Sequence, residues 1–128
     1  MHVKIDTKQK FHVITIQEPV LHANMTENLI QELMHYLQKD VKNIVLRCTE
    51  IREMELPAAE AILTIQQKAY EKNASFVICE LQPGVEDYLE AEGILELMNV
   101  TPTESEAWDI VQMEEIEREL LGGEWDEG

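Results

Sequence analysis

The sequence predicts one α/β domain with a mixed, mostly parallel sheet of four to five strands, an N-terminal hairpin and about four helices. Two apolar runs, at 43–48 and 75–79, have the composition of strands buried on both faces, and a helical pattern follows each of them. The 128 residues suit one domain, which we expect to span residues 1–121. Residues 122–128 are expected to form an acidic, disordered tail.

The hairpin is expected at the N-terminus. Polar and apolar residues alternate at 3–6 and at 12–16, and a polar run separates these two segments. A first helix should follow, with Asn24 or Thr26 as its cap, because apolar residues recur every three or four positions as far as residue 37.

A second helix is expected over residues 58–72, between the two buried strands. Pro57 suits a first helical position, where its missing N–H costs nothing, and Asn73 is expected to end the helix. Small residues at the start of this helix allow it to approach the sheet, or a partner, closely.

The C-terminal part predicts two further helices. One spans residues 85–92 and stops at Gly93. Residues 94–98 form either one more helical turn or the approach to a short strand at 99–100. A last helix is expected from the capping-box pattern at residues 103–106 to about Leu121, with Gly122 ending it.

The composition is strongly acidic, with a net charge of −16. Residues 65–128 hold 17 of the acids and 3 of the bases. This charge disfavours binding to nucleic acid or to an anionic membrane surface, and no apolar run is long enough for membrane insertion. The charge either attracts a basic partner or serves solubility. Cys48 and Cys79 lie in apolar runs, which predicts buried, reduced thiols and a cytoplasmic location.

The sequence offers no recognisable chemistry for an enzyme. The four histidines and two cysteines lack metal-ligand spacing, so no metal is expected. No Gly-rich phosphate loop occurs, no cofactor is predicted, and no nucleophile pairs with a base by spacing alone. The remaining feature is the turn at residues 52–59, where a strand ends and a helix begins, and this is where α/β domains usually bind a ligand or carry a modification.

The order of these elements resembles that of the STAS domain, the fold of anti-sigma-factor antagonists. The resemblance covers about residues 3–115. It rests on the hairpin, the strand at 43–46, the helix that contains 61–63, and the segment 75–78 followed by 81–85, together with Gly93-Ile94 and the motif at 103–107. It implies regulation by contact with a protein partner, an anti-sigma factor that is also a serine kinase.

The resemblance also identifies a switch position. The family pattern is Asp, then Ser, Ser or Thr, Gly and Leu, and the matching residues are Glu55, Leu56, Pro57, Ala58 and Ala59. Leu56 stands at the phosphoacceptor position and has no hydroxyl, so the usual phosphorylation is not expected there. Two other hydroxyls, those of Thr49 and Thr64, are left open as alternative acceptors.

We therefore predict a non-catalytic signal-transduction module that acts as a monomer or weak dimer. The residues expected to contact the partner are Arg52, Glu53, Met54, Glu55, Leu56, Pro57, Ala58, Ala59 and Ile62. Glu55 either mimics the phosphorylated state or stabilises the helix dipole, and Leu56 either faces the partner or packs on the core. The alternative functions are an accessory STAS-like subunit of a transport ATPase or other assembly, and an enzyme that uses the carboxylates. The C-terminal segment 114–121 either binds a partner or packs as a terminal helix.

Overall fold

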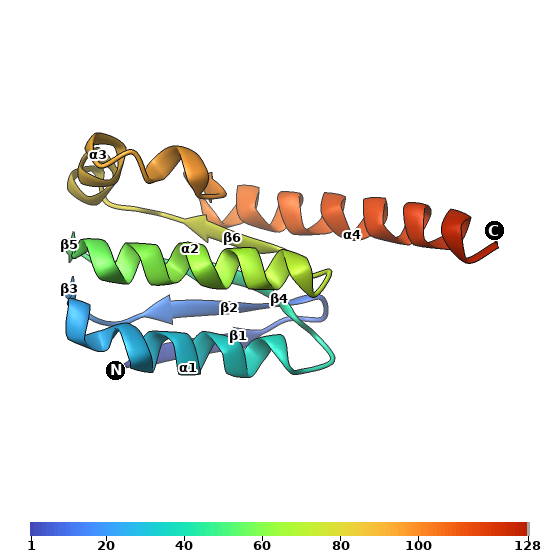
Figure 1. Cartoon of the computed structure of the whole chain (residues 1–128), viewed down its shortest axis with the longest axis horizontal. Helices are drawn as coiled ribbons and strands as arrows, with labels where there is room; N and C mark the ends of the chain where they lie inside the picture. The colour runs from blue at the N-terminus through green and yellow to red at the C-terminus, as the bar shows by residue number, and fades with distance from the viewer. Residues whose placement is uncertain (128) are drawn as a thin grey trace.

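The computed structural model describes residues 1–127, with side chains as far as Leu121. The strands are β1 (Val3–Thr7), β2 (Phe11–Ile16), β3 (Val20–Leu21), β4 (Asn43–Arg47), β5 (Glu53–Met54), β6 (Phe76–Cys79) and β7 (Val100–Thr101). The helices are η1 (Ala23–Met25), α1 (Thr26–Leu37), α2 (Leu56–Glu71), α3 (Pro83–Ala91), η2 (Leu95–Leu97) and α4 (Glu104–Glu127), where η marks a 3₁₀ helix (Figure 1).

The main sheet has five strands in the order β1-β2-β4-β6-β7. β1 runs antiparallel to β2, from the pair Val3 and Ile16 to the pair Thr7 and His12, and every other neighbouring pair is parallel. The predicted mixed sheet with an N-terminal hairpin is therefore confirmed. The segment at 94–98 contains the 3₁₀ turn η2, and the short strand β7 follows it. The predicted extra helical turn and the predicted approach to a short strand are therefore both partly correct.

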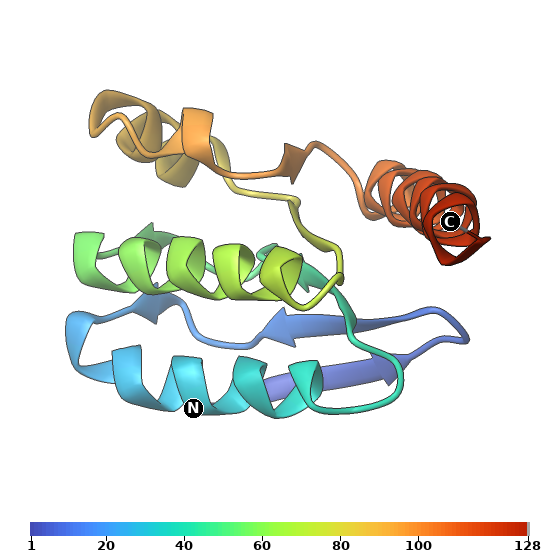
Figure 2. The same cartoon turned by 45° about the vertical axis from the view of Figure 1, so that its right-hand side comes forward.

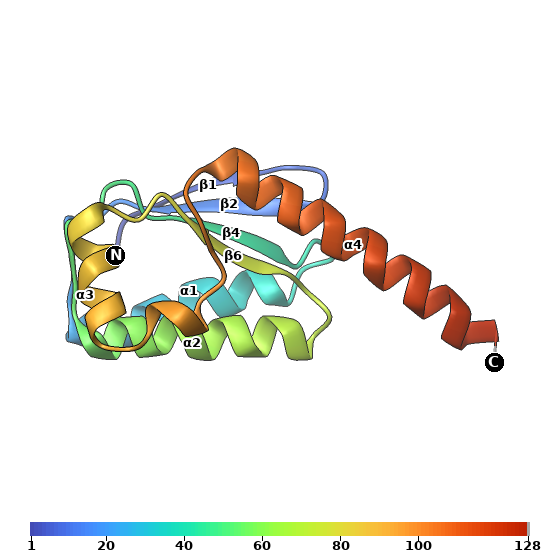
Figure 3. The same ribbon diagram turned by 90° about the horizontal axis from the view of Figure 1, so that it is seen from above.

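Helices cover both faces of the sheet. Figure 3 shows α1 and α2 on one side and α4 on the other. Figure 2 shows α3 and η2 on the β6 side of the domain, followed by β7 and α4. This three-layer arrangement explains why the central strands are apolar at consecutive positions, since both of their faces are buried.

The alternation along β2 shows how the two layers divide the core. Ile14 and Ile16 belong to the apolar cluster that α1 and α2 complete, whereas Phe11 and Val13 belong to the cluster beneath α4. All six residues of β2 are buried. Successive side chains point to opposite faces of a strand, so one run of apolar residues serves both layers.

The predicted stops of two helices are confirmed. α2 ends before Asn73, which has a left-handed φ of 60°, and the N–H of Ala74 donates to the carbonyl of Ala69 at 2.9 Å. α3 ends before Gly93, with φ of 73°. Left-handed backbone suits Asn and Gly better than other residues, which is why these two positions end their helices.

Two predicted helix ends are wrong. Met25 is the N-cap of α1, and neither Asn24 nor Thr26 caps the helix with its side chain, because the preceding turn η1 leads directly into α1. α4 continues to Glu127, beyond its predicted stop at Gly122, because glycine inside a helix costs only about 1 kcal/mol. The side chains of residues 122–128 lie outside the described part of the structure, so the disordered tail predicted for these residues stays a prediction.

The two cysteines are free and buried, as predicted. Burial is the main cause that raises the pKa of the Cys79 thiol to about 12, and burial likewise raises the pKa of Cys48. None of the helices described in residues 1–127 is both long and apolar enough to cross a membrane.

Candidate functional site

The turn before α2 is held by a small parallel ladder. β5 pairs with β3, with Val20 opposite Glu53 and Leu21 opposite Met54. Backbone bonds extend the ladder on both sides: the N–H of Arg52 donates to the Pro19 carbonyl at 2.7 Å, and the N–H of Glu55 donates to the Leu21 carbonyl at 3.0 Å. The sequence did not predict this pairing, because strands of two residues carry no periodic pattern.

Glu55 connects the start of α2 to η1. It is the N-cap residue of α2, but its side chain does not cap that helix. Its Oε1 instead accepts a hydrogen bond from the backbone N–H of Ala23 at 2.6 Å and lies 3.6 Å from Nδ1 of His22. Glu55 precedes the first turn of α2, which itself contains no acid, and both interpretations of Glu55, the mimic of the phosphorylated state and the dipole-stabilising acid, stay predictions.

The structure divides the predicted contact residues into two groups. Arg52, Glu53, Glu55 and Pro57 are exposed, and Leu56 is half-buried. Four others are buried, namely Met54, Ala58, Ala59 and Ile62. Ala58, Ala59 and Ile62 pack in the core because their short or apolar side chains let α2 lie close to the sheet, so their assignment as contact residues is wrong for this conformation. Met54 of β5 is buried but also lines the hollow described next, so its contact with a partner stays a prediction.

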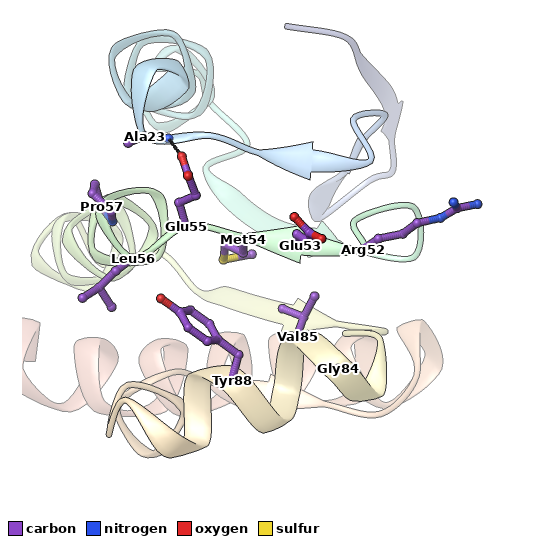
Figure 4. Close-up of a pocket in the computed structure, with 10 residues that line it drawn as sticks. All are labelled: Ala23, Arg52, Glu53, Met54, Glu55, Leu56, Pro57, Gly84, Val85 and Tyr88. Atoms are coloured by element: carbon purple, nitrogen blue, oxygen red, sulfur yellow. Dashed lines mark hydrogen bonds between the residues drawn. The ribbon is translucent and has the colours of Figure 1, made fainter.

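Leu56 packs on the core, as one of its two interpretations predicted, and contact with a partner stays a prediction. It packs against the core cluster, and it also lines a hollow between the start of α2 and helix α3, with a volume of about 530 Å³. Figure 4 shows Tyr88 of α3 on the opposite wall, with its hydroxyl directed towards the turn, while Arg52 extends away from the other lining residues. The hollow therefore has an apolar wall and a charged rim.

α3 supplies the part of this site that sequence reasoning missed. Gly84, Val85 and Tyr88 all line the hollow. Tyr88 is 39% exposed. The order of the strands could have indicated this contribution. α2 and α3 follow the neighbouring parallel strands β4 and β6, whose carboxyl ends meet at one edge of the sheet, so the two helices begin close together.

Glu80 connects several segments at the same edge of the sheet. It follows β6 with a left-handed φ of 60°. Its carboxylate accepts hydrogen bonds from the Thr49 hydroxyl at 2.7 Å, from Arg47 Nε at 3.2 Å and from the backbone N–H of Glu104 at 3.2 Å. The Thr49 hydroxyl and then Arg47 lower the pKa of Glu80. The other open hydroxyl, on Thr64, donates to the Glu60 carbonyl one turn earlier in α2.

The described lining of the hollow combines apolar residues with a few charged ones. No Ser, Thr, Cys, Lys or His belongs to its described lining, which contains the carboxylates of Glu53 and Glu55, Arg52 and the Tyr88 phenol. Over the described part of the chain, no three His, Cys, Asp or Glu side chains lie together in a way that would hold a metal ion. Such a surface suits apolar contact with a charged rim.

Comparison with known proteins identifies the family. Residues 2–107 match the STAS domain. The chain belongs to the STAS domain family. The match confirms the resemblance expected from the order of the elements, and it ends within the first turns of α4. No curated protein sequence matches this STAS chain significantly.

Solved structures share its fold at low sequence identity. An anti-sigma factor antagonist from Mycobacterium paratuberculosis superposes with a TM-score of 0.75 at 11% identity, covering 87% of this chain and 93% of that one. A serine-to-glutamate variant of RsbS from Moorella thermoacetica gives 0.72 at 18%, covering 88% and 96%. The murine anion transporter Slc26a9 gives 0.68 at 15%, covering 81% of this STAS chain and 18% of the transporter. At these identities the likeness establishes the fold.

Proposed function

We propose that this STAS domain is a non-catalytic regulatory module that binds a protein partner through the hollow and its rim, without phosphorylation at Leu56. The observation that carries the proposal is the position of Leu56, which lines a hollow of about 530 Å³ at the strand–helix junction. An apolar anchor beside a concave surface is typical of an interface centre, and the charged rim adds specificity.

The proposed partner is an anti-sigma factor of the serine-kinase type, in the cytoplasm. The structural likeness to an anti-sigma factor antagonist supports this choice. The partner would fill the hollow between Leu56 and Tyr88 and would meet the charges of Arg52 and Glu53 at its edge. Because Leu56 offers no hydroxyl, binding would be released by competition or by a change in the partner.

The test compares two leucines of α2. Leu56 and Leu63 are both half-buried and both pack against the same core cluster, but only Leu56 lines the hollow. A candidate anti-sigma-factor kinase is mixed with wild type, Leu56→Asp or Leu63→Asp in the presence of ATP, and complex formation is measured by size-exclusion chromatography. We expect Leu56→Asp to weaken binding by at least about tenfold and Leu63→Asp to retain it, because a buried charge in an interface is costly.

Two results would overturn the proposal. Equal binding by wild type and Leu56→Asp would place the interface elsewhere. Stoichiometric phosphate within residues 49–64, detected by intact-mass and peptide mass spectrometry, would reinstate a phosphorylation switch.

A second function is favoured by the transporter likeness. The same fold forms part of the murine anion transporter, of which this chain covers 18%. A subunit of a transport assembly would use the domain as a scaffold. Stable copurification with an ATPase or transporter, unaffected by Leu56→Asp, would favour this second function.

A further inference from the structure

Helix α4 has two apolar faces, one packed against the sheet and the other exposed. Ala107 and Val111 are fully buried beneath the helix, against the sheet cluster that includes Val45 and Val77. Met113, Ile116 and Leu120 are 56%, 57% and 66% exposed. Their spacing of three and four residues places them on one stripe of the helix, on the side opposite Val111. We refer to these three residues as the α4 stripe.

Hydrogen bonds to the sheet and to α2 fix the rotation of α4 and so keep the stripe outward. Oε1 of Glu114 accepts from the Ser75 hydroxyl at 2.5 Å and from the Tyr70 hydroxyl at 2.8 Å. Asn43, which is buried, donates from Nδ2 to Glu115 at 2.8 Å. Rolling the helix to cover the stripe would break these part-buried bonds, and unpaired buried polar groups are costly. The stripe is therefore a stable feature of the surface.

The second observation is the charge around the stripe. Between residues 104 and 121, the only basic side chain is Arg118, and it is engaged by Glu115 at 3.0 Å and by Asn43 at 3.2 Å. Exposed acids lie on the same helix before the stripe residues and between them, including Asp109, Glu117 and Glu119. A second copy of this chain would bring acids against acids. A partner with lysine or arginine beside an apolar face would complement both features.

We propose that the α4 stripe is a docking surface for a basic amphipathic helix of a protein partner. An amphipathic helix presents apolar anchors at the same three- and four-residue spacing, so its apolar face can cover Met113, Ile116 and Leu120. Its flanking cations would then face the carboxylates. The stripe lies beyond residue 107, where the family match ends, and α4 extends past the sheet (Figure 3). This surface is thus separate from the hollow at the start of α2.

The test uses the full chain and a synthetic peptide probe. The probe is a leucine–lysine peptide patterned as an amphipathic helix, and a scrambled peptide of the same composition controls for net charge. Binding is measured by fluorescence anisotropy and mapped by NMR chemical shifts. The stripe variant carries Met113→Gln and Ile116→Gln. The control variant, Leu97→Gln, changes another exposed apolar residue, one that is 60% exposed and lies outside α4.

We expect the amphipathic peptide to bind wild type and Leu97→Gln equally, with the largest shifts at residues 109–120. The stripe variant should bind it at least about tenfold more weakly while keeping a native NMR spectrum. Four results would overturn the proposal: no binding to wild type, equal binding by the stripe variant, equal binding of the scrambled peptide, or a wild-type dimer that the stripe substitutions dissociate. The last would make a second copy the occupant.

Discussion

Replacing Glu80 separates the contribution of its carboxylate from the cost of its backbone conformation. Glu80→Ala removes the acceptor for Thr49, for Arg47 and for the N–H of Glu104. A hydrogen bond to a charged group contributes about 1.5–3 kcal/mol, and one unsatisfied buried group costs about 1–3 kcal/mol. The Glu80 side chain is 27% exposed, so water replaces part of this loss. We expect the free energy of unfolding to fall by about 1–3 kcal/mol.

Glu80→Gly tests the backbone. Glu80 has φ of 60°, a conformation that costs a residue with a Cβ about 1–2 kcal/mol. Glycine does not have that cost, but it increases the conformational entropy of the unfolded chain. This increase lowers the free energy of unfolding by about 0.4–1 kcal/mol and so offsets part of the gain. The glycine variant should therefore be more stable than the alanine variant by about 0.8 kcal/mol, the difference between the middles of these two ranges. Glu80→Gln, which keeps the size and removes the charge, should lie between wild type and alanine.

Urea unfolding followed by circular dichroism at neutral pH measures all four proteins. Equal stability of the alanine and glycine variants would refute the argument from backbone conformation. Equal stability of wild type and Glu80→Gln would refute the argument from charge.

Two other predictions concern ionisable groups. Asn43 and then Arg118 lower the pKa of Glu115, so its carboxylate stabilises the fold above the unfolded glutamate pKa of about 4.3 and loses that effect as the pH falls below it. The difference in unfolding free energy between wild type and Glu115→Gln should shrink from neutral pH to about pH 3 in chemical denaturation, and a constant difference would contradict this linkage. Burial raises the thiol pKa of Cys48 and Cys79. Iodoacetamide near pH 8 should therefore modify these thiols slowly in the native protein and rapidly in urea. Rapid modification of the native protein would contradict this prediction, because it would show that the thiols are accessible.

The fold was accessible from the sequence because its central strands carry strong local signals. The run that contains β4 is apolar at consecutive positions because that strand is buried between two helical layers. The apolar residues of α2 recur at helical spacing because one face of the helix packs on the sheet. Asn73 and Gly93 ended their helices as expected because left-handed backbone depends on the residue at that position. Gly122 shows the limit of this reasoning, since glycine permits a helix to end but does not require it.

The site was less accessible because it depends on tertiary neighbours. The turn at Leu56 was identified from its place between a strand and a helix, but the wall supplied by Tyr88 comes from another crossover. Met54 and Ile62 were expected at a surface, and their apolar character gave no indication of which side would be buried. Glu55 was expected either to mimic the phosphorylated state or to stabilise the helix dipole, and neither expectation included the hydrogen bond that its carboxylate accepts from Ala23, 32 positions earlier.

The pairing of β3 with β5 has a consequence for the rate at which a partner binds. Ordering one backbone residue costs about 1–2 kcal/mol in conformational entropy, and a free loop would lose it at the moment of association. Here the ladder between Leu21 and Met54 has fixed the main chain during folding. A partner that docks at this turn, as proposed, would meet a nearly rigid target, and its rate of association should depend on the geometry of collision and on the charges of Arg52 and Glu53.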